Sequence, residues 1–169
     1  MNSLASALVF CLLLTPQKVG EVVTDADKAV DFSAIHTYAW SKGHDASDPR
    51  AHKAIIAEVE TQMTALGFKQ APAASADVLL TYHTVRGSEI DLKKLDELLK
   101  KEDQAAATAG ATRILGHLAL VMSRPSTRAT IWSAGTRRRL SDDPAKRNAE
   151  LHNAVTALFA TYPGAKKPK

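Results

Sequence analysis

Hydrophobic residues are spaced along the chain in two ways, and each spacing predicts a different secondary structure. Short runs rich in β-branched and aromatic residues predict strands. They cover residues 21–24, 37–40, 77–85, 114–122 and 129–136. Apolar residues recurring every three or four positions predict two helices, one after Asp48 and one after Asp143.

Both predicted helices share a start signal, an Asp followed by a Pro. The Asp side chain accepts a hydrogen bond from a free N–H of the first turn, and Pro lacks an N–H that would be unpaired there. The apolar positions of the first helix are Ile55, Ile56, Val59, Met63 and Leu66, with Gly67 as its stop. Those of the second helix are Leu151, Val155, Leu158 and Phe159, with Tyr162-Pro163-Gly164 at its end.

The order of the elements predicts the fold class. The strands at 114–122 and 129–136 are separated by a short turn around Pro125, which is typical of a hairpin. The whole order is β, β, α, β, inserted α, β, β, α. We therefore expect an α+β fold with one small, mostly antiparallel sheet and helices packed on one face.

The segment 88–111 differs from its surroundings. Leu92, Leu95 and Leu99 form one apolar stripe, and Lys, Asp and Glu occupy most of the other positions up to residue 103. This pattern indicates an amphipathic helix with salt-bridge patterning, followed by a linker of small residues. The stripe has two open roles, packing on its own domain or docking a partner helix.

An unbroken apolar run at residues 4–14 indicates a targeting segment. A membrane-spanning helix needs about 20 such residues, whereas the hydrophobic region of a signal peptide has roughly 7–15. We expect a signal peptide or N-terminal anchor at 1–20, a single domain at 21–164 and a basic tail at 165–169. Cys11 is a candidate lipidation site, although Phe10 before it is larger than the small residue that lipidation signals carry.

Composition adds limits to this picture. The chain has 169 residues, 45% of them hydrophobic, which fits one domain with a real core. A single cysteine excludes an internal disulfide and a cysteine-based zinc site. The formal net charge of +4 permits contact with anionic lipid, cell-wall polymer or nucleic acid but selects none of them.

Several short blocks follow the pattern of a known family. They are Val23-x-Asp25-x-Asp27, Asp31-Phe32-Ser33, Thr37-Tyr38-Ala39-Trp40, Leu66-Gly67-Phe68, Ala76-Asp77-Val78-Leu79-Leu80, Ile131-Trp132 and Tyr162-Pro163. Their order resembles the bacterial envelope proteins grouped as domain of unknown function 4136, many of which are predicted lipoproteins. The resemblance covers roughly residues 21–164. It implies an α+β fold, export and an envelope location, in the periplasm or at an envelope membrane of a Gram-negative bacterium.

No established catalytic pattern is present in the sequence, and the family resemblance implies no activity. The chain has no Gly-rich phosphate loop, HExxH, GxSxG or EF-hand pattern. We expect a non-enzymatic domain without a cofactor that binds a protein or an envelope lipid or polymer. Nucleic acid is not an expected partner, because no nucleic-acid-binding motif is present. The alternatives are an envelope hydrolase and a metal-binding protein.

Two candidate sites remain. Arginines gather around the predicted hairpin, and their guanidinium groups suit carboxylate and phosphate, so we predict an anion-binding set. It consists of Arg113, Arg124, Arg128, Arg137, Arg138 and Arg139. The candidate metal ligands are His44, Asp45 and His52, on a loop and the first helical turns. His83 and His117, on neighbouring predicted strands, are half-buried residues or parts of a proton-linked or metal site.

Overall fold

The computed structural model describes residues 20–86, 114–141 and 143–165. Its elements are β1 (Val22–Ala26), a 3-10 helix (Phe32–Ala34), β2 (Thr37–Trp40), α1 (Pro49–Ala65), β3 (Lys69–Gln70), β4 (Val78–Arg86), β5 (Ile114–Ser123), β6 (Thr130–Leu140) and α3 (Pro144–Phe159). Cys11, the inserted helix expected within 88–111, and nearly all of the expected leader and tail lie outside the described residues. Within the described ranges, no helix is long and apolar enough to cross a membrane.

The strands form one six-stranded sheet in the order β1-β6-β5-β4-β2-β3. The pairs β1–β6, β6–β5 and β5–β4 are antiparallel, whereas β2 pairs with both β4 and β3 in parallel. The α+β class is therefore confirmed, but the expectation of a mostly antiparallel sheet is wrong, because the sheet is mixed. The reason is that α1 carries the chain back along the sheet between β2 and β4, so both strands point the same way.

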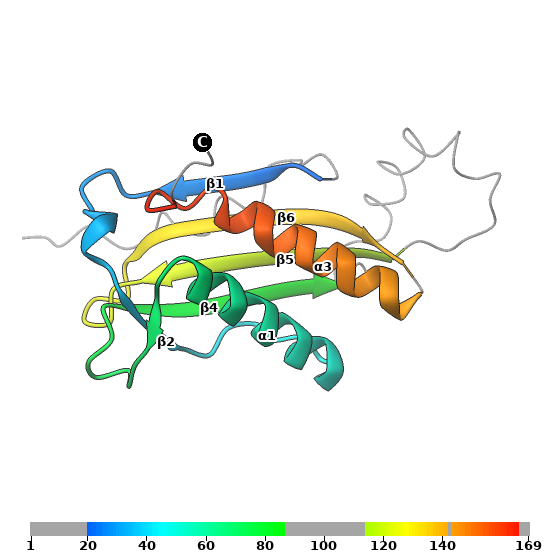
Figure 1. The fold of residues 1–169 in the computed structure, drawn as a ribbon, viewed down its shortest axis with the longest axis horizontal. Coiled ribbons are helices and arrows are strands. Elements are labelled where there is room, and N and C mark those ends of the chain that lie inside the picture. Colours follow the sequence, from blue (N-terminus) through cyan, green and yellow to red (C-terminus); the bar gives the residue numbers. More distant parts are fainter. Residues whose placement is uncertain (1–19, 87–113, 142, 166–169) are drawn as a thin grey trace, which may run out of the picture.

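Both helices lie on one face of the sheet (Figure 1). Strand residues alternate between the two faces, so every second side chain points toward the helices. Fully buried side chains of the core between the helices and the sheet include Val59, Met63, Val155 and Leu158 from the helices, and Val78, Leu80, Tyr82, Leu120, Met122 and Trp132 from the strands. The predicted hydrophobic stripes of the helices thus form the helical side of this core.

The two helices begin where the sequence predicts. Asp48 accepts a hydrogen bond from the backbone N–H of Arg50 at 2.9 Å, and Asp143 accepts one from Ala145 at 3.0 Å. The helices touch further along, where His152 Nδ1 lies 2.9 Å from Glu58 Oε1 and Gln62 donates to Thr156 at 3.1 Å. Both begin at the same end of the sheet, the right-hand end in Figure 1, where β4 ends and β5 begins.

Candidate functional site

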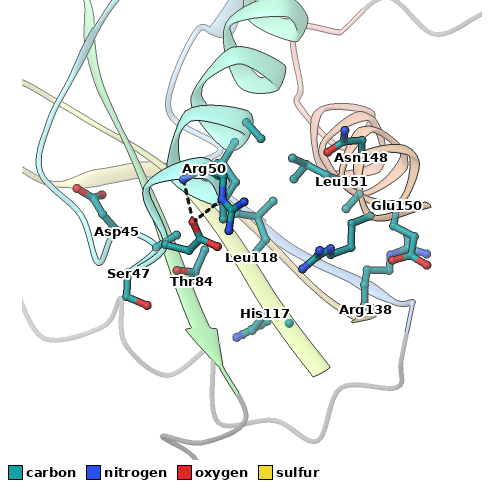
Figure 2. A pocket seen from close by; sticks show the side chains of 18 of the residues that line it. Asp45, Ser47, Arg50, Thr84, His117, Leu118, Arg138, Asn148, Glu150 and Leu151 are labelled. Carbon is teal, nitrogen blue, oxygen red and sulfur yellow. Dashed lines mark hydrogen bonds and ion pairs between the residues drawn. The ribbon is translucent and has the colours of Figure 1, made fainter. Parts of the chain in front are cut away.

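A cavity of about 580 Å³ lies between the first halves of α1 and α3, above the sheet (Figure 2). Its lining comes from the loop before α1, both helices, and strands β4, β5 and β6. Ligand pockets of small molecules usually measure about 300–1,000 Å³. We take this cavity as the candidate functional site.

The floor of the cavity is a row of three residues on adjacent strands. Thr84 pairs with Leu118, and Leu118 pairs with Thr136, so their side chains share the face that carries the helices. Leu118 and Thr136 are buried, and the Thr136 hydroxyl donates to the backbone oxygen of Glu21 at 3.0 Å. The Thr136 hydroxyl therefore has a protein partner, and Leu118 makes the centre of the floor apolar.

The walls of the cavity are apolar and partly built from small side chains. Ala51, Ala54 and Ile55 come from α1, and Leu151 and Ala154 come from α3. Alanines on both helices leave space between the first turns that larger side chains would fill. The cavity ends where the helices approach each other.

The rim of the cavity carries charges of both signs. Asp48 and Arg50 stand at the start of α1, with 3.9 Å between Asp48 Oδ1 and Arg50 Nε. Arg147 and Glu150 stand on α3, and Glu150 accepts a hydrogen bond from the backbone N–H of Ser141 at 2.9 Å. The rim is polar and close to balanced in charge, whereas the floor is apolar.

Arg138 is the charged residue that reaches the cavity from the sheet. It pairs with Gly116 on β5, which has no side chain to occupy the space beside it. The Arg138 side chain is partly exposed, but its Nε is buried and has no hydrogen-bond partner among the described residues. A buried N–H without an acceptor costs about 1–3 kcal/mol. This Nε is closed off from solvent, so a ligand in the cavity first meets the exposed part of the Arg138 side chain.

The structure separates the arginines that the sequence placed in one anion-binding set. Arg124 and Arg128 lie at the turn between β5 and β6, while Arg137 and Arg138 lie at the opposite end of the hairpin. Gly116 and Ser123 are seven positions apart on β5, about 23 Å at the usual rise per residue. Arg137 and Arg138 point to opposite faces, because successive strand residues alternate.

Two members of the set cannot be located. Arg113 and the side chain of Arg139 lie outside the described part of the chain. Of the described members, only Arg138 lines the cavity.

The candidate metal ligands have other neighbours. The backbone N–H of His44 donates to His83 Nδ1 at 3.2 Å, and His52 Nδ1 contacts the Tyr82 hydroxyl. Asp45 lines the cavity together with His44, whereas His52 does not. Over residues 20–86, 114–141 and 143–165, no three His, Cys, Asp or Glu side chains are placed to hold a metal ion.

Alternation along β4 and β5 directs the His83 and His117 side chains to the face of the sheet away from the helices, while residue His117 also forms part of the cavity lining. His83 pairs with Ala119, two positions from His117, so the two histidines are diagonal neighbours on β4 and β5. Burial lowers the pKa of both imidazoles, and the pKa is lowered further by His44 for His83 and by Arg137 for His117. Both rings therefore favour the neutral form near neutral pH.

Most cavity residues were not singled out by sequence reasoning. The floor depends on the register of three strands that come from segments far apart in the chain, and no single-segment pattern encodes that register. The sequence carries one signal that could have found them, because alternation over 114–122 puts Leu118 on one face with Leu120 and Met122.

The comparisons with known proteins identify a family and a fold. A family model described as "Domain of unknown function (DUF4136)" matches residues 22–164. No curated protein matches the chain.

Solved structures share the fold at low sequence identity. A variant PelC dodecamer and a PelC dodecamer, both from Paraburkholderia phytofirmans, match with TM-scores of 0.53 at 14% and 12% identity. Each covers 83% of this chain, and the match spans 97% and 94% of the PelC chains. A PDZ domain protein from Parabacteroides distasonis matches with a TM-score of 0.56 at 17% identity, over 86% of this chain and 36% of that protein.

Proposed function

Because the chain belongs to the domain of unknown function 4136 family, we propose that it is a non-enzymatic binding domain of the bacterial envelope whose ligand occupies the cavity between α1 and α3. The observation that carries this proposal is the cavity itself. Its volume, apolar floor and polar rim match those of pockets that bind small molecules or the ends of larger ones. The ligand is an envelope component, with a protein partner as the other possible occupant.

The proposed location rests on the sequence. The apolar run at 4–14 has the length of a signal-peptide hydrophobic region, and the family resemblance implies an envelope location. The protein is exported to the periplasm or held at an envelope membrane through its N-terminus. Lipidation of Cys11 would supply such a tether.

Fractionation of the native host, followed by intact mass measurement, tests the location. A periplasmic form shortened near residue 20 supports export, and so does a membrane form with diacylglycerol on Cys11. The mass distinguishes the secreted form from the lipoprotein. A full-length cytoplasmic form would refute the envelope proposal.

Native mass spectrometry of the recovered protein tests the binding function. Ala54 lines the cavity, so Ala54→Phe fills part of it, whereas Ala57 is exposed on α1 and does not line it. We expect a co-purified ligand on the natural protein and on the Ala57→Phe control, and its loss from Ala54→Phe. A ligand that stays on Ala54→Phe, or no ligand on any form, would contradict the proposal.

The same preparation tests the alternatives. Turnover of envelope polymer by the purified protein would point to a hydrolase, and stoichiometric metal by elemental analysis would point to a metal-binding protein. Either result would replace the proposed function.

A further inference from the structure

Arg138 brings a positive charge to the cavity from the sheet, and apolar side chains lie around it. Its Nε is buried and has no acceptor among the described residues, whereas other parts of the side chain are exposed. A guanidinium group stays charged at all physiological pH values. A ligand group that contacts the exposed part of Arg138 must therefore supply a hydrogen-bond acceptor, and an anionic acceptor gives the stronger bond.

Three carboxylates near the cavity already have partners within the protein. The carboxylates of Asp48 and Asp143 cap the two helices, so the free N–H groups of the first turns face protein carboxylates. Glu150 accepts from the backbone N–H of Ser141. The helix starts therefore provide no open anion site, and Arg138 remains the group to be matched.

The remaining surface inside the cavity favours an apolar chain. Leu118 lies at the centre of the floor, while Ile55 and Leu151 stand on the two walls. These three side chains are apolar and form no hydrogen bonds with water. Displacing water from such a surface with an apolar chain is favourable.

On the basis of the proposed binding function, we infer that the cavity takes an amphipathic ligand with one terminal anionic group and a single apolar chain. The anionic group, a carboxylate or a phosphate monoester, accepts hydrogen bonds from Arg138. The chain lies along Leu118 between the walls. The planar fork of an arginine matches both anions with two parallel hydrogen bonds, which also fixes the orientation of the ligand.

The test uses the folded protein and three probes that share one chain length. They are decanoate, decyl phosphate and the uncharged decanol, and binding is measured by isothermal titration calorimetry. We expect decanoate or decyl phosphate to bind at least about tenfold more tightly than decanol. A tenfold difference in affinity corresponds to one charge-assisted hydrogen bond. The stronger of the two anions identifies the carboxylate or the phosphate as the head group.

Two arginine variants assign the effect to one residue. Arg138→Gln removes the charge in the cavity, and Arg137→Gln makes the same change on the opposite face of the same strand. We expect Arg138→Gln to lose about tenfold in affinity for the anion and little for decanol, and Arg137→Gln to change neither. Thermal melting shows whether each variant is folded. If Arg138→Gln does not fold, the comparison of the three probes on the natural protein still tests the ligand class.

The outcomes separate this inference from the proposed function. Equal binding of decanol and both anions, or unchanged affinity in a folded Arg138→Gln, would overturn the ligand class. Failure of all three probes, while Ala54→Phe still displaces a co-purified ligand, would overturn the ligand class and leave the binding function in place. If no probe binds and Ala54→Phe leaves the co-purified ligand in place, both the ligand class and the proposed binding function are overturned.

Discussion

Thr37 and Asp77 are joined by hydrogen bonds in both directions. Asp77 Oδ2 accepts from the Thr37 N–H at 2.9 Å and from the Thr37 hydroxyl at 2.8 Å, and the Thr37 hydroxyl accepts from the Asp77 N–H at 3.0 Å. The pair stands just before Tyr38 and Val78, which are partners in the parallel ladder of β2 and β4. Two sequence blocks that carry the family resemblance thus meet at one point of the fold.

Asp77→Ala is expected to destabilise the protein by about 1 kcal/mol, because it removes the carboxylate that accepts from the N–H groups of His36 and Thr37, while water replaces part of these exposed bonds. Urea unfolding measures the change. Asp31→Ala is the control, since within the described part of the chain the Asp31 carboxylate accepts from Ser33 two residues away and joins no strands. Equal losses in the two variants would contradict the role given to Asp77.

Stability should fall on mild acidification because of the sheet histidines. The pKa of His83 and of His117 lies below the ordinary imidazole value of 6.5, mainly through burial. The unfolded chain therefore binds protons more readily, and stability decreases as the pH falls from 6.5 through the folded pKa values. NMR titration of the two rings measures these values. A midpoint above 6.5 for either ring would contradict the prediction.

Gly43→Ala should destabilise the protein more than its control, Gly67→Ala. A Cβ at residue 43 would collide with the backbone oxygen of Tyr82, which the sheet holds in place, so we expect a loss of about 3 kcal/mol. Gly67 has φ +88° and open space around it, so Gly67→Ala costs only the left-handed backbone, about 1–2 kcal/mol. Thermal unfolding ranks the two, and the reverse order would refute the steric argument.

Trp132→Phe is expected to cost less than about 1.5 kcal/mol. Trp132 is fully buried and stacks on Phe159, with 5.8 Å between ring centroids, yet its Nε1 has no hydrogen-bond partner among residues 20–86, 114–141 and 143–165. Phenylalanine keeps most of the stacking and removes the unpaired donor, so the two effects partly offset each other. Trp132→Ala, by contrast, should cost about 3–5 kcal/mol. Chemical denaturation of both variants measures the loss of stability. Similar losses in the two variants would show that the buried Nε1 does not destabilise the protein.

Local chemistry predicted the helices well. The Asp-Pro starts at residues 48 and 143 place α1 and α3, because capping depends only on neighbouring residues. The end of β6 was predicted less well, at residue 136 instead of Leu140. The residues that follow are charged, but their backbone pairs with the start of β5, and it is this hydrogen bonding that makes them a strand.

The candidate site was harder to predict than the fold. The sequence analysis predicted that the arginines at 137–139 belong to one anion-binding set. Alternation along β6 instead places Arg138 at the cavity and Arg137 on the other face of the sheet. The parallel pairing of β2 with β4 depends on where α1 returns the chain, which the spacing of apolar residues does not state. Both properties arise from contacts between distant segments.

The position of β1 at the edge of the sheet has a consequence for the order of folding. Its partner is β6, and the Thr24 hydroxyl donates to the backbone oxygen of Ser133, 109 residues later. A chain made from its N-terminus therefore carries its first strand unpaired until nearly all of the domain has been synthesised. Contacts of such long sequence separation close large loops and form slowly, so the docking of β1 is expected to be a late step.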